Sequence, residues 1–114
     1  MRHILLSLVS AMFLATSAQA ADAPPASANE FNLVIKDHVF TPSELTVPAD
    51  QKFTLIIENQ DKTPEEFESH DFHREKIIPA GKKVKIPAGP LKAGTYSFFG
   101  EFNPKTAQGK IIVK

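Results

Sequence analysis

The sequence contains no cysteine, and it has only two methionines among its 114 residues. Without cysteine no disulfide can cross-link the fold, so a hydrophobic core, or a core together with a bound metal, must stabilise it. Thiolate metal sites are excluded for the same reason. Both methionines, Met1 and Met12, fall within the first twenty residues, so the remainder of the chain offers no sulfur ligand of any kind.

Neither sign of charge dominates the chain, which has 13 Lys and Arg against 13 Asp and Glu. If an N-terminal segment that contains Arg2 is removed, the rest of the chain has a net charge of −1. This balance gives no reason to expect a nucleic acid partner or a polybasic membrane contact. The sequence also has no apolar run that is long enough to span a bilayer comfortably, so stable membrane insertion is not expected.

The N-terminus has the three parts of a secretory signal peptide. A short basic region at Arg2 and His3 precedes an apolar segment over 4–15, and Ala18-Gln19-Ala20 has the small-x-small pattern of a cleavage site. We therefore expect residues 1–20 to be removed on export, and we expect the mature protein to be periplasmic.

The residues after the expected cleavage site divide into two parts. Residues 21–29 are small, polar and proline-containing, which is typical of a flexible leader. From Glu30 onward, short alternating segments are separated by proline and glycine turns, and no segment has the helical period. Residues 30–114 are therefore predicted to form one all-β domain, a β-sandwich or small barrel of about eight strands. The expected strands cover 31–36, 39–42, 44–47, 51–59, 65–69, 82–86, 94–99 and 109–113.

Potential metal ligands are densest between Thr63 and Lys76. Carboxylates and imidazoles suit iron, copper, zinc or manganese rather than a soft thiolate site. The alternative interpretation is a solvated acidic edge strand followed by a loop, since charged runs usually face water. The stretch reads TPEEFESHDFHREK and contains Glu65, Glu66, Glu68, His70, Asp71, His73 and Glu75.

The strand over 65–69 must place its glutamates on two faces. Alternation puts Glu65 on the same face as Phe67, and Glu66 and Glu68 on the opposite face. A carboxylate that faces a sandwich core must be paired or metal-bound, because an isolated buried charge is very costly. The sequence leaves open which of the two sets faces a metal.

Three segments resemble the cupredoxin family. The first is FTPSELTVPADQKFTLIIEN over 40–59. The second is PEEFE over 64–68, followed by IIPAGKKVKI over 77–86. The third is AGTYSFFGEFNPKTAQGKIIV over 93–113. The resemblance covers about residues 30 to 114, and it implies a cupredoxin-like Greek-key β-sandwich of about 7–8 strands.

The positions that bind copper in that family carry other residues here. A type 1 copper centre uses two His, one Cys and a weak axial Met. The matching positions in this sequence are Glu65, Gly100, Asn103 and Ala107. The chain is therefore not expected to be a blue-copper electron carrier.

The run Glu66-Phe67-Glu68 resembles the Glu-aromatic-Glu of sulfur-poor cupredoxin-like proteins in bacterial oxidase-coupled ferrous iron uptake. What this resemblance implies is a small periplasmic component that binds an iron or copper ion as an accessory to iron transport and aids Fe(II) oxidation. The implied partners are an inner-membrane iron permease and a periplasmic companion protein. The sequence itself shows no independent catalytic centre.

The candidate metal ligands combine the strand, the loop after it and the former copper loop. Glu101 follows Gly100 and would join the strand from the other end of the chain, and the two loop histidines would add nitrogen donors. The full candidate set is Glu65, Glu66, Glu68, His70, His73 and Glu101. The competing hypothesis is a metal-free β-sandwich that serves as an interaction module for a membrane permease or an oxidase, and the loss of all four family ligands favours it.

Overall fold

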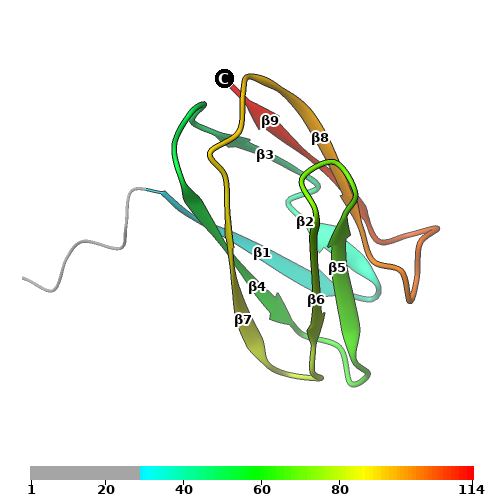
Figure 1. The fold of residues 1–114 in the computed structure, drawn as a ribbon. Helices are drawn as coiled ribbons and strands as arrows, with labels where there is room; N and C mark the ends of the chain where they lie inside the picture. Colours follow the sequence, from blue (N-terminus) through cyan, green and yellow to red (C-terminus); the bar gives the residue numbers. More distant parts are fainter. Residues whose placement is uncertain (1–28) are drawn as a thin grey trace, which may run out of the picture.

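The computed structural model describes residues 29–114, so the predicted signal peptide and all but the last residue of the predicted leader lie outside the described residues. In this part of the chain the fold is built from nine strands without a helix (Figure 1). The strands are β1 (Glu30–Lys36), β2 (Val39–Thr41), β3 (Glu44–Val47), β4 (Phe53–Asn59), β5 (Glu65–Ser69), β6 (Arg74–Ile78), β7 (Lys83–Ala88), β8 (Gly94–Phe99) and β9 (Gln108–Val113). None of the described residues belongs to a helix long and apolar enough to cross a membrane.

The strands form two sheets. The four-stranded sheet has the order β2-β1-β4-β7, and the five-stranded sheet has the order β3-β9-β8-β5-β6. The β1–β4 and β3–β9 pairs are parallel, while the other neighbours run antiparallel. The prediction of an all-β sandwich is confirmed, and β5 lies inside its sheet rather than at the edge.

The core lies between the two sheets and follows the alternation of the strands. In β4 the side chains of Phe53, Leu55 and Ile57 are buried, and each is followed by a half-exposed residue. The five-stranded sheet contributes Phe67 and Phe98, whose rings stack with centroids 5.0 Å apart. Because Phe67 of β5 points into this core, the adjacent Glu66 and Glu68 point to the outer face of the sheet.

The strand β6 was not predicted from the sequence. Its first four residues are exposed and only Ile78 is buried, so the segment lacks the alternation that indicates a strand. It is nevertheless an edge strand, because all five of its residues pair with β5 in an antiparallel hairpin. The stretch from Thr63 to Lys76 is therefore a loop and a two-stranded hairpin rather than an edge strand followed by a loop.

Asn59 organises the loop between β4 and β5. It is wholly buried, and its amide nitrogen donates hydrogen bonds to the carbonyl oxygens of Thr63 and Ile78, each 2.9 Å away. Its side-chain oxygen accepts a hydrogen bond of 2.8 Å from the backbone N–H of Asp61. Every polar atom of the side chain is used, so Asn59 fixes the position of Asp61 and the entry into β5.

Replacement of Asn59 by alanine is expected to destabilise the protein by about 1–3 kcal/mol, because it leaves buried backbone groups without partners. Chemical denaturation of the protein measures this loss. The exposed neighbour Gln60 is the matched control, and Gln60→Ala should stay within about 0.5 kcal/mol of the wild type. Equal stabilities of the two variants would contradict the structural role of Asn59.

Candidate metal centre

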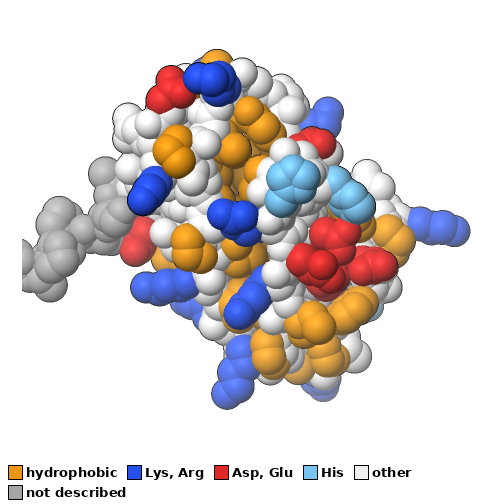
Figure 2. Space-filling view, in the orientation of Figure 1, with side chains coloured by type: hydrophobic (Ala, Val, Ile, Leu, Met, Phe, Trp, Pro, Cys, Tyr) orange, Lys and Arg blue, Asp and Glu red, His pale blue; other side chains and the backbone are white. Residues whose placement is uncertain are grey.

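Four carboxylates converge on the outer face of the five-stranded sheet. Glu66 and Glu68 point there from β5, and Glu75 of β6 is the direct cross-strand partner of Glu68. Glu101 arrives from the loop after β8, and its backbone N–H donates a hydrogen bond of 2.8 Å to Oε1 of Glu66. One carboxylate oxygen from each of the four residues lies within 4.8 Å of the others. Figure 2 shows acidic side chains gathered in one patch beside histidine side chains.

Glu66 is the buried member of this carboxylate cluster. Only 2% of its surface is exposed, whereas Glu75 and Glu101 are exposed. Burial is the main cause that raises the pKa of Glu66 to about 7, the hydrogen bond from the Glu101 N–H opposes it, and the nearby Glu68, Glu75 and Glu101 contribute to the rise. Close to neutral pH, Glu66 therefore exchanges a proton, and a cation in the cluster would compete with that proton.

The loop between β5 and β6 brings His70 against the cluster. Its Nε2 lies 2.6 Å from Oε2 of Glu68, and its ring stacks on Phe99 with centroids 5.3 Å apart. Asp71 ties this loop to β8, since it accepts hydrogen bonds of 2.8 and 3.0 Å from the N–H and the hydroxyl of Ser97. These hydrogen bonds lower the pKa of Asp71. His70 is thus held beside the carboxylates, where its ring nitrogen can serve as a fifth donor.

Glu65 belongs to a different group on the opposite face of β5. It is wholly buried, and its Oε1 lies 2.6 Å from Nδ1 of His38 and 3.3 Å from Nδ2 of Asn103. Asp61 completes the group, with Oδ2 at 3.7 Å from the same His38 nitrogen. The hydrogen bond to Glu65, followed by the charges of Glu65 and Asp61, raises the pKa of His38.

The structure separates the predicted ligands. Glu66, Glu68 and Glu101 share the outer cluster, with His70 beside it, while Glu65 faces inward. His73 belongs to neither group of ligands within residues 29–114, because it ends the hairpin loop with a left-handed backbone (φ 56°) and an exposed side chain. The sequence left open whether Glu65 or the pair Glu66 and Glu68 faces the site, and in the structure it is Glu66 and Glu68 that lie beside Glu101.

The candidate set drawn from the sequence did not include Glu75, which lies in the ligand-dense stretch, or His38 and Asp61. Glu75 joins the cluster only through the hairpin register, in which it stands opposite Glu68. Recognition of the four-residue loop over 70–73 as a hairpin turn would have revealed this pairing. His38 and Asp61 lie in segments that are far from Glu65 in the sequence or separated from it by a loop. No local sequence pattern predicts that their side chains contact Glu65.

The residues at the former copper position do not fit a type 1 centre. Glu65 and Asn103 lie in contact, as expected of the two histidine positions that they replace. At Gly100, however, an added Cβ would lie 2.8 Å from the carbonyl oxygen of Glu66 and 3.0 Å from Cβ of Ala107. A cysteine there would collide with the backbone, and the chain supplies no other thiolate. Blue-copper chemistry is therefore excluded by the donor set and by packing.

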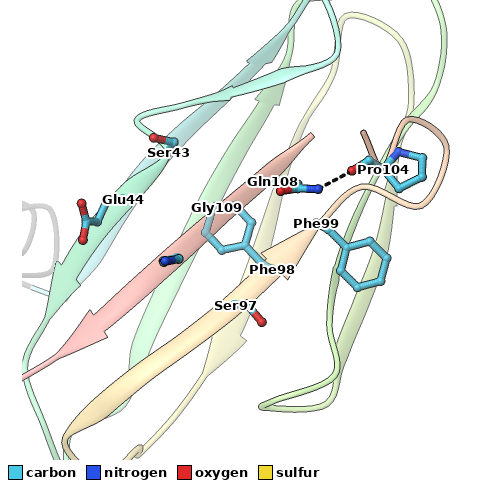
Figure 3. A pocket seen from close by; sticks show the side chains of 9 residues that line it. Ser43, Glu44, Ser97, Phe98, Phe99, Pro104, Gln108 and Gly109 are labelled. Atoms are coloured by element: carbon cyan, nitrogen blue, oxygen red, sulfur yellow. Dashed lines mark hydrogen bonds between the residues drawn. The ribbon is translucent and has the colours of Figure 1, made fainter. Parts of the chain in front are cut away.

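A separate depression of about 650 Å³ opens along β8 and β9 (Figure 3). Ser43 and Glu44 lie on one side of it, and Phe99 lies on the other. Gln108 closes one end by donating a hydrogen bond of 2.8 Å to the carbonyl oxygen of Pro104. Among residues 29–114, Glu44 is the one acidic residue that lines this depression, so the described lining does not bring several carboxylates or imidazoles together as a metal site would.

Solved structures share this fold at low sequence identity. A copper-binding protein in its apo form is 22% identical with a TM-score of 0.66, over 75% of this chain and 86% of the other. Auracyanin A, a blue copper protein from Chloroflexus aurantiacus, is 16% identical with a TM-score of 0.65, over 75% and 98%. The metal-binding domain of a Cu(I)-exporting P-type ATPase from Streptococcus pneumoniae D39 is 11% identical with a TM-score of 0.67, over 75% and 84%.

Sequence comparison gives a closer relative and a family. An uncharacterized protein of Rickettsia prowazekii (strain Madrid E) is 52% identical over 84 residues, which are 74% of this chain and 67% of the relative. The family model of the cupredoxin-like domain matches residues 4–113. With the two-sheet sandwich described above, this match shows that the chain belongs to the cupredoxin-like domain family.

Proposed function

We propose that this protein is a periplasmic metal-binding protein that holds an iron or copper ion in the carboxylate cluster of Glu66, Glu68, Glu75 and Glu101. The observation that carries the proposal is the convergence of these four carboxylates around one buried member, Glu66. His70 adds an imidazole nitrogen at the edge of the cluster. Oxygen donors with an imidazole form a hard to intermediate donor set, which accepts iron and Cu(II) without sulfur.

Electrostatics supports a cation at this position. Like charges placed directly opposite one another on neighbouring strands are destabilising, and Glu68 and Glu75 form such a pair. Glu66 adds a carboxylate that is almost removed from water, which is costly unless it is protonated or paired. A bound metal ion would offset both costs at once, and the exposed Glu75 and Glu101 leave it a path from solvent.

The proposed role is delivery of the ion to an iron transport system. The signal-like segment over 1–20 supports a periplasmic location, and the Glu-aromatic-Glu run at 66–68 supports a part in ferrous iron uptake. The proposed partners are an inner-membrane iron permease and a periplasmic companion protein. An ion held on an outer face, rather than in the core, suits transfer to a second protein.

The proposal is tested by calorimetric titration of the mature protein with Fe(II) under anaerobic conditions, and then with Cu(II). Glu101→Gln removes an exposed donor without disturbing the core, and it should weaken binding at the cluster by roughly 10- to 100-fold. Glu44→Gln, which changes an exposed acid on β3, is the control and should bind as the wild type does. If Glu101→Gln binds both metals like the wild type, the cluster is only a charged surface.

A second function has its own supporting observation. Ile77, which pairs with Glu66 across the hairpin, is 55% exposed, and Phe102, the neighbour of Glu101, is 48% exposed. These two apolar side chains flank the carboxylates on β6 and on the loop after β8. A metal-free interaction module would dock a partner protein on this surface, and it would do so equally well in Glu101→Gln and without added metal.

A further inference from the structure

The group of His38, Asp61 and Glu65 lies apart from the carboxylate cluster and is made by different segments. His38 comes from the β1–β2 turn, Asp61 from the β4–β5 loop, and Glu65 from the first position of β5. One nitrogen or oxygen from each of the three lies within 4.8 Å of the others. Because adjacent residues of a strand point to opposite faces, Glu65 and its neighbour Glu66 serve separate sites.

The carboxylate of Glu65 has unused coordinating capacity. The side chain is wholly buried, and Oε1 is engaged by His38 and Asn103. Oε2 is buried as well, yet it has no hydrogen-bond partner within residues 29–114. A buried polar atom without a partner is rare in native proteins and demands an explanation. An ion that binds the free oxygen would supply one.

The local backbone holds His38 in place at this site. The β1–β2 hairpin has a two-residue turn in which Asp37 and His38 both have positive φ, of 52° and 61°. Such turns favour Asn-Gly or Asp-Gly, so histidine is an unusual occupant. Asp61 offsets the strain by accepting hydrogen bonds of 2.6 and 3.1 Å from the N–H groups of Asp37 and His38.

Solvent reaches the group through an open depression of about 430 Å³. The residues that line it include His38 and Asp61, together with Asp37, Lys36 and Lys62. Oε1 of the buried Glu65 lies 2.6 Å from Nδ1 of His38. An incoming ion would therefore meet the imidazole and the Asp61 carboxylate first, and it would reach the buried carboxylate of Glu65 through them.

We propose that His38, Asp61 and Glu65 form a second metal site, which binds a divalent first-row transition ion such as Zn(II) or Cu(II). One imidazole and two carboxylates provide three protein ligands, and water completes the coordination. The ion replaces the proton that His38 Nδ1 shares with Glu65, and that proton is released to solvent. The protein thus holds two ions, one on each face of β5, and this site does not depend on the function proposed for the carboxylate cluster.

The test uses titration of the mature protein with Zn(II), with the stoichiometry measured by calorimetry and the location by amide chemical shifts in NMR spectra. His38→Asn removes the imidazole, and asparagine tolerates the positive φ of the turn. His73→Asn is the matched control, because it makes the same change at an exposed histidine with φ 56° that lies outside both groups. Glu101→Gln weakens the other site and leaves this one alone.

The wild type and His73→Asn are expected to bind two equivalents of Zn(II), with one set of shifts around Asp37 and Asp61 and another around Glu101. His38→Asn should lose the first set and weaken binding there by at least roughly tenfold. Glu65→Gln keeps the shape of the buried side chain and should have the same effect on Zn(II) binding. It replaces His38→Asn as the test variant if His38→Asn does not fold. Unchanged Zn(II) binding around Asp61 in either folded variant would overturn the proposal, as would shifts confined to Glu101 in the wild type.

Discussion

Glu66→Gln is expected to lose metal binding at the carboxylate cluster and, at the same time, to make the metal-free protein more stable at neutral and alkaline pH. Glu66 is the buried member that the other three carboxylates surround, so its charge is the one that a cation compensates most. An amide keeps the size of the side chain but offers a weaker donor and no charge. Metal affinity should therefore fall by at least roughly tenfold.

The stability change follows from the raised pKa of Glu66. In the folded protein this pKa is about 7, against an ordinary value of 4.5. Below pH 4.5 the carboxyl group is protonated in both folded and unfolded chains. Between pH 4.5 and about 7 only the folded protein holds the proton, so the free energy of unfolding falls as pH rises through this window. The loss at higher pH is about 1–3 kcal/mol, and Glu66→Gln should abolish it.

Thermal unfolding of the metal-free proteins at a series of pH values between 4 and 9 measures this difference. The wild type should lose stability between pH 4.5 and about 7, and Glu66→Gln should show a flatter profile that lies above it at pH 8. Glu44→Gln is the control for removal of an exposed charge, and it should follow the wild type. A Glu66→Gln profile parallel to the wild type would show that Glu66 is not the group that titrates.

Phe67→Ala is expected to cause the largest loss of stability, about 3–5 kcal/mol, because the cavity it leaves cannot be filled by its neighbours. Phe67 is wholly buried between Glu66 and Glu68 on β5. Its ring stacks on Phe98 and meets Phe40 edge-on with centroids 6.1 Å apart. This loss is a large part of the 5–15 kcal/mol that usually stabilises a domain.

Urea denaturation measures the effect as a lower midpoint with an unchanged slope. Phe102→Ala is the control, since Phe102 is 48% exposed and its loss should change stability by no more than about 0.5 kcal/mol. A loss below about 1 kcal/mol in Phe67→Ala would mean that the aromatic layer behind β5 is not packed as described.

The sequence predicted those parts of the fold that alternation specifies. The strands over 44–47, 65–69 and 94–99 have the predicted bounds. The first and third alternate apolar with polar residues, whereas the second, EEFES, has Phe67 as its one apolar residue and was also supported by the resemblance of PEEFE to the cupredoxin family. The edge strand β6 was not predicted, because an edge strand with a solvated face can be charged at almost every position and then lacks apolar alternation. Its existence depends on pairing with β5, which is a long-range property.

The candidate site was predictable in its location but not in its membership. The resemblance to the cupredoxin family indicated the start of β5 and the loop after Gly100, and both segments contribute residues to the candidate carboxylate cluster. Whether Glu65 or Glu66 faces a site could not be decided from alternation, since both are buried, each on its own side of the sheet. His38 pairs with Glu65 across 27 residues of sequence. Contacts of this range arise from the packed fold and leave no local pattern.

The carboxylate cluster is tested most directly by a crystal structure of the protein grown anaerobically with Fe(II), with an anomalous difference map recorded at the iron edge. We expect an anomalous peak on the outer face of β5, within coordination distance of Glu66 and Glu101, with Glu68 or Glu75 as a further ligand. A map without an anomalous peak between these residues would contradict a metal site in the carboxylate cluster. This holds whether iron is bound elsewhere in the crystal or not at all.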